Sequence, residues 1–435
     1  MPARPRHLLS SALVTALLAT VLVLAPATER ASLAKTQPAL AKSAATPAVA
    51  VDAQARIKLF DEVWSRVRES FYDSHFSGLD WQAVGDRYRP QVAASGADPA
   101  QVINRMLAEL GTSHTFYYTP ADTAYYDLAD IFFGGSRGDI SKQFPGGEVV
   151  YTGIGMLTRV IEGRYFITGI LSGFAAEAAG LAVGDELVAA DGAPFEEVGS
   201  FAGKAGRKVT LTIRRKAQGK TQDVIVTPAF LHPNKDYRDA MEKGARIIEA
   251  GGRRIGYVHV WSYARFQYQQ LLEELLTKGK LKDADALVWD LRDGWGGADP
   301  SYLDIFNPRS PTMTWTGRSG ERDIVNGRWR KPVVLLINEG TRSGKEVLAY
   351  GFRKYDYGMI VGTTSAGAVL AGRAFMLSNG GLLLLAVADV SVDGERLEGK
   401  GVAPLIEVPF DIRYAEGNDP QLARAIDLLA KPVSD

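Results

Sequence analysis

The chain has 435 residues, which is enough for two or three domains. Hydrophobic residues make up 46% and charged residues 23%, as in an ordinary soluble globular protein, and 50 basic side chains balance 50 acidic ones, so the net charge of +0 does not favour a nucleic-acid partner. The absence of cysteine excludes disulfides, a cysteine nucleophile and cysteine–zinc sites.

The N-terminus has the pattern of an export signal. Arg4 and Arg6 precede an apolar stretch over residues 8–25, and Ala25-Pro26-Ala27 has the small-x-small pattern of a signal-peptidase site. We therefore predict a signal peptide over residues 1–27 and a periplasmic or secreted protein. The apolar stretch is also near the lower limit for a spanning helix, so an uncleaved membrane anchor is the alternative.

A linker and a helical domain are expected next. Residues 28–51 are rich in alanine and proline, which is typical of a flexible linker. Apolar residues then recur at helical spacing in RIKLFDEVWSRVRESFY, and two more helical stretches follow; the third opens with Asp98-Pro99, an N-cap before proline. We predict an N-terminal helical domain over residues 52–130 and a mobile glycine-rich connection over residues 131–147.

Residues 148–230 have the short apolar periods of β-strands. The stretches YFITGIL, GDELVAADG and KVTLTIRRK are β-like, and the second ends at an Asp-Gly turn. FAAEAAG, between the first two, is expected to be a short helix closed by Gly180. The pattern predicts a compact β-rich domain.

From Arg254 to about Ile412, buried-type strands alternate with helices, which predicts an α/β domain with a mixed or parallel sheet. The expected strands are RIGYVHV, ALVWDLR, PVVLLIN, GMIVG and GGLLLLAVADVSV, and the helices between them are YQQLLEELLTKG and KEVLAYGFRK. A terminal amphipathic helix is expected in DPQLARAIDLLAK. We assign this domain to residues 240–435.

Ser343 lies where the strand PVVLLIN turns sharply into the helix KEVLAYGFRK, with Gly340 and Gly344 nearby. One interpretation is a helix cap, because serine is favoured at the N-cap and Glu346 completes a capping box. The other is a nucleophile at a helix N-terminus, where the N–H of Gly344 can help to bind an oxyanion. On this stretch alone, the cap is the commoner pattern.

A serine nucleophile needs a base, and histidine is the first to consider in a chain without cysteine or a metal motif. We expect His75 and His232 to be solvated in polar segments, and His259 to be a strand residue that faces one side of the sheet. His114 lies in ELGTSHTFYY, just past a helix end, where catalytic groups are often placed. A capping or core role is the alternative for His114.

Three features of the chain form a joint pattern over residues 55–412. The first is the order of the helical, β-rich and α/β parts. The second is a pair of sequence motifs, GIGM (Gly153–Met156) and AAEAAGLAVGDELVAADG (Ala175–Gly192). The third is the series DLRDGWGG, INEGTRSGKE, VGTTSAGA and LEGKGVAP. Together they resemble the C-terminal-processing (tail-specific) serine peptidases, including the tricorn protease core. The resemblance implies an α/β multidomain fold: an N-terminal helical domain, a PDZ-like domain and a ClpP/crotonase-like α/β peptidase core.

The resemblance implies that Ser343 is the nucleophile. In the Ser/Lys branch of the family, a lysine follows about 25 positions later, but this chain has Ala368 there, so it departs from that pattern. Lys345 and Lys400 match no motif, and we expect Lys345 to project away from Ser343 as a surface charge.

The tricorn-like branch uses a TSH segment and a glutamate before xxGVxP. Here these are Thr112-Ser113-His114 and Glu398, which implies His114 as the base and Glu398 and Ser113 as supporting polar groups. The alternative is that Glu398 is only a solvated turn residue. Glu395, three positions earlier, is a second candidate for the supporting acid.

Two glycine segments have implied binding roles. The oxyanion hole is expected to use the N–H groups of Gly344 and Gly297, although the GWGG glycines could also form a plain tight turn. GIGM occupies the place of a PDZ carboxylate-binding loop, so Gly153, Ile154 and Gly155 are candidates for peptide binding. The module could instead be a lid or a spacer.

The leading hypothesis is therefore a periplasmic or secreted serine endopeptidase that acts on protein or peptide substrates, selected through their C-terminal ends. It implies no cofactor, no metal and no nucleic acid. The alternatives are a catalytically inactive peptide-binding protein and an esterase-type hydrolase on the same core.

Overall fold

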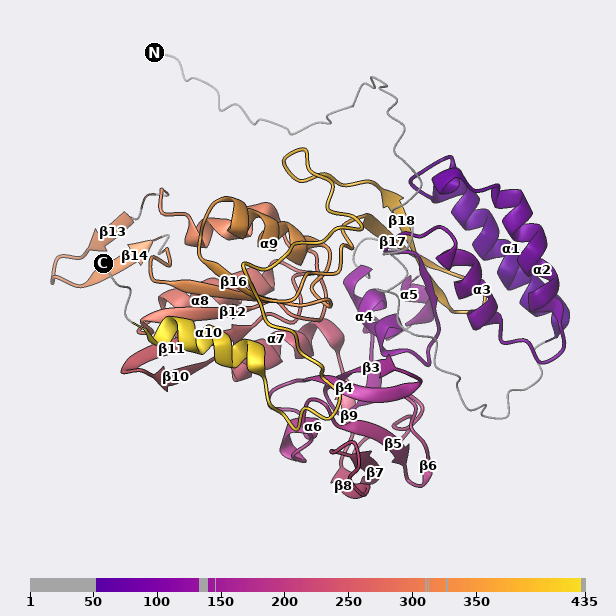
Figure 1. Cartoon of the computed structure of the whole chain (residues 1–435), viewed down its shortest axis with the longest axis horizontal. Helices are drawn as coiled ribbons and strands as arrows, with labels where there is room; N and C mark the ends of the chain where they lie inside the picture. Colours follow the sequence, from indigo (N-terminus) through magenta and orange to yellow (C-terminus); the bar gives the residue numbers. More distant parts are fainter. Residues whose placement is uncertain are drawn as a thin grey trace, which may run out of the picture.

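The computed structural model describes residues 52–132, 140–144, 146–309, 311, 313–325 and 328–431 (Figure 1). The predicted signal peptide and linker, residues 1–51, lie outside the described residues, as do residues 133–139 of the predicted glycine-rich connection. Over the described ranges, no helix has the length and apolar character needed to cross a bilayer.

Three amphipathic helices begin the described chain. They are α1 (Ala53–Ser70), α2 (Trp81–Ala93) and α3 (Pro99–Ala108), with the 3-10 turn η2 (Phe76–Gly78) after α1. The Asp98 side chain accepts a hydrogen bond from Ala100 N (2.9 Å) and so caps α3, as predicted. The apolar faces of the helices share one core, which includes Val63, Ile103 and Met106.

The helices pack on a three-stranded antiparallel sheet whose strands come from both halves of the chain. Its order is β1 (Phe116–Tyr118), β18 (Leu382–Ala388), β17 (Ala371–Met376). Leu383 and Leu385 belong to the core of α1–α3, whereas Leu382 and Leu384 belong to a core with α4 (Thr123–Phe132). The prediction that GGLLLLAVADVSV adds a strand to the α/β sheet is wrong, because this run is apolar on both faces and lies between two layers of N-terminal residues.

The β-rich module, residues 151–231, forms the lower part of Figure 1. Its main sheet has the order β3 (Met156–Ile161), β4 (Arg164–Ile170), β5 (Glu186–Ala190), β7 (Val209–Arg214), β8 (Gln222–Val226), and β6 (Ala193–Pro194) pairs with β5. The first and last strands of the module, β2 (Tyr151–Gly153) and β9 (Ala229–Leu231), pair with each other. The short helix α6 (Ala175–Ala178) follows β4. The three predicted strands and the short helix are confirmed. The module has its own core, which includes Ile167, Phe201 and Leu211.

A six-stranded sheet forms the α/β core. Its order is β10 (Arg246–Ala250), β11 (Arg253–His259), β12 (Ala286–Asp290), β15 (Val333–Ile337), β16 (Met359–Gly362), β19 (Ile406–Glu407), and all neighbours are parallel except β10 with β11. One face packs against α7 (Pro233–Gly244), α8 (Gln267–Thr277), η3 (Pro300–Phe306) and α9 (Gly344–Lys354), and α10 (Pro420–Ala430) covers the other. Outside this sheet lie α5 (Ile140–Gln143) and the hairpin of β13 (Met313–Thr316) and β14 (Arg322–Val325).

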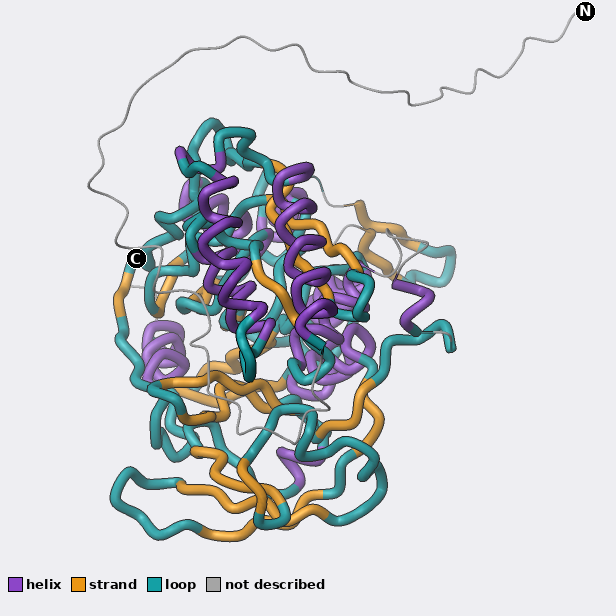
Figure 2. Tube along the Cα trace, turned by 90° about the vertical axis from the view of Figure 1, so that its right-hand side faces the viewer, coloured by secondary structure: helices purple, strands orange, loops and turns teal. Residues whose placement is uncertain are grey.

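The parallel strands bring loops from distant segments to one edge of the sheet. The carboxyl ends of β12 and β15 are neighbours, so the glycine turn after β12 and the turn that carries Ser343 after β15 meet there. The 90° view in Figure 2 shows α1 and α2 side by side as purple coils in front, with the strands of the β-rich module below them.

Candidate active site

Ser343 occupies a strained corner between β15 and α9. Its backbone has φ 57° and ψ −131°, a left-handed conformation that is rare for any residue except glycine. The predicted capping box is present, with Glu346 Oε2 accepting from Ser343 N (3.2 Å). A cap normally has a negative, β-region φ, so capping does not account for the strain, whereas a nucleophile elbow requires it.

A hydrogen-bonded series links Glu398 to His114 through Ser113. The Ser113 hydroxyl donates to Glu398 Oε2 (2.9 Å), and Ser113 N donates to Glu398 Oε1 (2.9 Å). The hydroxyl oxygen also lies 2.8 Å from His114 Nδ1. Because the Ser113 hydrogen is directed to the carboxylate, Nδ1 must be the donor to Ser113. His114 Nε2 is then the unprotonated nitrogen, which is the form that a general base needs.

His114 lies on the wall of the same cleft as Ser343, an open space of about 1110 Å³. A Cβ at Gly372 in β17 would lie 2.9 Å from His114 Cδ2, so the sheet of β1, β18 and β17 holds the imidazole closely. Burial, together with the nearby Arg342 charge, lowers the pKa of His114 to about 4. No hydrogen bond joins His114 to Ser343 among the described residues, and such bonds are often long before a substrate is bound.

Glu346 holds the segment that faces Ser343. Its buried carboxylate accepts from Ser365 Oγ (2.6 Å), Gly367 N (2.7 Å) and Ala368 N (2.8 Å), and Ala368 O in turn accepts from Ser343 N (2.8 Å). Burial raises the pKa of Glu346, while these donors oppose the shift. Ala368, which stands at the lysine position of the Ser/Lys branch, thus contributes backbone contacts to the Ser343 corner. The capping-box pattern was the only sequence signal for Glu346.

The prediction that Lys345 is a surface charge is wrong. Lys345 is fully buried, and its Nζ donates to Asp293 O (2.7 Å) and Trp261 O (3.3 Å). Burial lowers the pKa of Lys345 to about 7. The first turn of α9 packs against the glycine turn after β12, and Lys345 supplies the donor for the Asp293 carbonyl of that turn. No pattern in the sequence distinguishes this lysine from an exposed one.

The glycine turn after β12 packs directly against the Ser343 corner. A Cβ at Gly296 would lie 2.5 Å from the Cβ of Ser343, and one at Gly344 would lie 2.3 Å from Ala298 N, so neither position has room for a side chain. Gly297 has φ 94° and lines the cleft. Within the described chain, no atom accepts a hydrogen bond from the N–H of Gly344 or Gly297. These two groups are therefore available to a ligand.

Residues 254–408 match peptidase family S41, and residues 52–108 match the tricorn protease C1 domain. The α/β part of the chain is therefore similar to peptidase family S41. Tricorn protease homolog 1 of Streptomyces coelicolor is 27% identical over 384 residues, which cover 85% of this chain and 35% of that protein, so this chain spans about a third of that relative's length. A carboxyl-terminal-processing protease of Synechocystis sp. is 25% identical over 400 residues and 87% of each chain. The solved photosystem II D1 C-terminal processing protease has the same fold, with a TM-score of 0.50 and 21% identity over 87% of this chain and 98% of that one.

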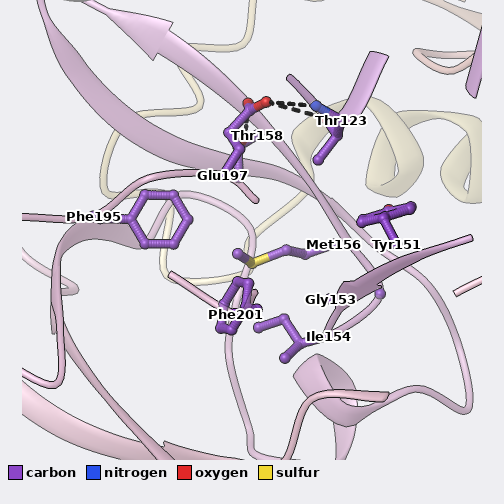
Figure 3. A pocket seen from close by; sticks show the side chains of 10 residues that line it. Thr123, Tyr151, Gly153, Ile154, Met156, Thr158, Phe195, Glu197 and Phe201 are labelled. Carbon is purple, nitrogen blue, oxygen red and sulfur yellow. Dashed lines mark hydrogen bonds between the residues drawn. The ribbon is translucent and has the colours of Figure 1, made fainter. Parts of the chain in front are cut away.

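The structure has a second, much smaller recess at GIGM in the β-rich module (Figure 3). Gly153, Ile154 and Gly155 line a pocket of only about 10 Å³, and Ile154 is buried. In the described part of the chain, the N–H groups of Ile154 and Gly155 have no acceptor. Across the recess, Glu197 accepts from Thr123 N (3.2 Å) and bonds Thr158 Oγ1, as the dashed lines in Figure 3 show.

The other histidines of the described residues do not line the Ser343 cleft. His259 ends β11, where its Nε2 bonds Arg292 O (2.9 Å) and its ring stacks on Trp261. His75 is exposed, and His232 stands at the start of α7 with partial exposure. These positions agree with the sequence-based expectation for all three. Of the two competing glutamates, Glu398 is buried and bonded to Ser113, whereas Glu395 is exposed.

Proposed function

We propose that this chain is an exported serine endopeptidase that hydrolyses peptide bonds in protein substrates through an acyl-enzyme. The observation that supports this most is the series Glu398–Ser113–His114, which ends at an unprotonated imidazole nitrogen in the cleft lined by Ser343. A base with an orienting acid beside a strained serine is the arrangement that acyl transfer needs.

In this mechanism, Ser343 Oγ attacks the scissile carbonyl carbon while His114 Nε2 takes the hydroxyl proton. The resulting imidazolium is stabilised through Nδ1–H and Ser113 by the Glu398 carboxylate. His114 then protonates the leaving amine as the C–N bond breaks, which leaves an ester on Ser343. A water molecule, deprotonated by His114, attacks this ester; as the ester bond breaks, His114 returns the proton to Ser343 Oγ, which releases the acid product and restores the free serine.

The developing oxyanion has two available donors. The N–H of Gly344 at the start of α9 and the N–H of Gly297 in the adjoining turn lack acceptors within the described chain. Donors fixed by backbone stabilise the charge without reorganising during the reaction. Their glycines allow the close approach, because a side chain at Gly344 would collide with Ala298.

Lys345 is the competing base, because its amine loses its proton near neutral pH. Its Nζ, however, is directed to the carbonyl groups of Asp293 and Trp261. We therefore assign Lys345 to positioning the glycine turn and His114 to proton transfer.

Substrate choice is proposed to depend on C-terminal ends. The relative named as a carboxyl-terminal-processing protease, and the acceptor-free N–H groups at Ile154 and Gly155, both favour a PDZ-like role for the β-rich module. We further propose that the N-terminal signal directs export and is cleaved near Ala27. N-terminal sequencing of the exported protein would contradict this if the mature chain still began at Met1 in the membrane.

The decisive test of the proposed function is labelling of the mature protein with a fluorophosphonate, followed by mass spectrometry of the modified peptide. We expect one adduct, on Ser343, that is absent from Ser343→Ala and present in Ser319→Ala, a control at an exposed serine. No labelling would favour the inactive peptide-binding protein. A panel of matched peptide and ester substrates would identify an esterase if only the esters are hydrolysed.

A further inference from the structure

Arg342 immediately precedes the nucleophile and lines the same cleft. Its guanidinium carbon lies 5.3 Å from the ring centre of Trp295, over the face of the indole. That indole is itself fixed, because its Nε1 donates to Asp127 Oδ2 (3.0 Å). The arginine therefore rests on a rigid aromatic platform beside the reaction centre.

The charge of Arg342 has no counter-ion in the part of the chain that the structure describes. Among the described residues, no carboxylate oxygen lies within 4.0 Å of its side-chain nitrogens, and its Nε is buried without a hydrogen-bond acceptor. Arg159, which also lines the cleft, differs: it is paired with Asp293 (3.0 Å) and Glu339 (2.7 Å). Of the two cleft arginines, Arg159 is therefore neutralised by carboxylates, whereas Arg342 has no carboxylate partner among the described residues.

Two acidic groups that line the same cleft are also not paired with Arg342. Asp127 Oδ2 accepts from Trp295 Nε1 and from the Tyr237 hydroxyl (3.0 Å), Oδ1 is buried without a partner among the described residues, and burial raises the pKa of this carboxyl to about 7. Glu197 is bonded to Thr123 and Thr158. A half-buried cation without a partner is unfavourable unless a ligand supplies the anion.

We propose that Arg342, on its Trp295 platform, is a subsite for a substrate carboxylate next to the scissile bond. The inference rests on the proposed peptidase function and specifies the substrate class: peptides with an acidic side chain near the cleaved bond, or with their terminal carboxylate there. The planar guanidinium suits either source, because it can donate two parallel hydrogen bonds to one carboxylate.

The position also couples substrate binding to the base. The Arg342 charge reaches His114, where it adds to burial in lowering the pKa. It also reaches Tyr118, whose pKa burial raises to about 12 against the effect of Arg342. A carboxylate bound to Arg342 neutralises this charge, so the pKa of His114 rises in the complex and the imidazole becomes a stronger base when an acidic substrate is present.

Binding without turnover tests the subsite separately from catalysis. Fluorescent peptides with amidated C-termini, identical except for Glu or Gln at one position, are titrated by anisotropy against Ser343→Ala, and the position is scanned along the peptide. We expect the Glu peptide to bind about tenfold more tightly than the Gln peptide at one position, as is typical of a charge-assisted pair. In Ser343→Ala/Arg342→Gln, this ratio falls to about one.

Two further variants make the result specific. Ser343→Ala/Arg373→Gln removes an exposed arginine of β17 that does not line the cleft and should keep the Glu preference. Ser343→Ala/Arg342→Glu should reverse the preference, so that a Lys peptide binds more tightly than its Gln counterpart. Circular dichroism verifies folding of each variant.

A second set of peptides, uncharged and with free or amidated C-termini, identifies the source of the carboxylate. A preference for the free acid that disappears in Arg342→Gln assigns the terminal carboxylate to this subsite. If neither the Glu preference nor the free-acid preference exists, or if both survive Arg342→Gln, the proposal is wrong. Failure of fluorophosphonate labelling at Ser343 would instead refute the peptidase function and leave the binding result intact.

Discussion

The Ser343 corner and the GIGM recess differ in how their polar groups are satisfied. At the corner, two buried carboxylates hold the facing segment: Glu346 accepts from residues 343, 365, 367 and 368, and Glu398 accepts from residues 113, 369 and 370. At the recess, the N–H groups of Ile154 and Gly155 have no acceptor within the described chain, and the space is about 10 Å³. At the corner, the supporting carboxylates are satisfied and hold the N–H groups of Gly344 and Gly297 in place for a ligand, whereas no carboxylate holds the free N–H groups of the recess among the described residues.

This difference has a physical consequence. A corner whose contacts are already formed can present a nucleophile, a base and oxyanion donors without reorganisation during the reaction. A recess with free donors and little space must open when a peptide enters, and the interactions gained must offset the cost of opening. Substitutions at the corner should therefore change turnover strongly, and substitutions at the recess should change binding modestly.

The largest effects are expected for Ser343→Ala and His114→Ala. Each should lower kcat by about 10⁴-fold or more, and the double variant should be little worse than either single one, because the two residues act as a unit. Peptide turnover with folding verified by circular dichroism measures this, and His75→Ala at an exposed histidine is the control. Additive losses in the double variant, or high activity in His114→Ala, would contradict the Ser–His assignment.

Glu398→Gln should lower kcat by about 10²-fold, which is less than loss of the base. Both Glu398 oxygens accept hydrogen bonds, from Ser113 Oγ and Val369 N on one and from Ser113 N on the other, so an amide NH₂ must oppose a donor. Ser113 then loses its fixed orientation, and the His114 tautomer is no longer enforced. Glu395→Gln, at the exposed neighbour, should leave kcat near that of the unmodified enzyme. Equal effects of the two substitutions would remove Glu398 from the mechanism.

The pH dependence of kcat/KM should reflect the lowered pKa of the partly buried His114 imidazole. The pKa of His114 is about 4, so the neutral base persists well below pH 6.5. At pH 5 the activity should exceed that expected for an imidazole of ordinary pKa by about 30-fold. A profile with its midpoint near pH 6.5 would show that the base is not buried in this way.

The same group links stability to pH. Because its pKa is lower in the folded state than in the unfolded state, the contribution of His114 to stability is fully present above about pH 6.5. It is lost as the pH falls toward 4, since the unfolded chain then binds the extra proton. Chemical unfolding of the His114→Ala variant between these pH values should therefore show a smaller decline in stability than the unmodified protein.

Lys345→Met should lower kcat by about tenfold, less than loss of a direct oxyanion donor, because it removes the side-chain donor to Asp293 O and one of the two donors to Trp261 O, and so loosens the glycine turn. The matched control is Lys354→Met in the last turn of the same helix, where the lysine is exposed and pairs with Asp393. If Lys345 only positions the turn, KM should change little and the pH profile should keep its shape. If Lys345→Met abolishes turnover while His114→Ala retains it, the lysine is the base.

Much of the fold follows from local patterns in the sequence. The apolar period of α1, the Asp98-Pro99 start of α3 and the buried run of β15 predict their elements correctly, because each depends on neighbouring residues. The pairing of β18 with β1 could not be predicted, since a strand that is apolar on both faces fits either sheet. The same holds for side chains whose environment comes from distant segments: Ser113 and Glu398 are 285 positions apart. Only the family resemblance joined them, and no resemblance indicated that Lys345 is buried or that Arg342 lacks a counter-ion.

The smallest predicted effect concerns the GIGM recess. If its free N–H groups bind a C-terminal carboxylate, amidation of a peptide should weaken its binding to Ser343→Ala by about fivefold. Gly155→Ala should remove this difference, because Gly155 has φ 77° and a Cβ there would lie 2.3 Å from the Cβ of Phe174. Gly163→Ala is the matched control: its φ is 76°, so the backbone strain is similar, but nothing lies within 4 Å of the added atom.

Anisotropy titrations of free-acid and amidated peptides against the two glycine variants measure the effect. Arg342→Gln in the same background separates the recess from the cleft, since only the recess is altered by Gly155→Ala. Equal affinity for free and amidated peptides in the Ser343→Ala protein would remove the carboxylate-binding role of Gly153, Ile154 and Gly155. A free-acid preference that survives in Gly155→Ala but not in Arg342→Gln would move that role from the β-rich module to the cleft.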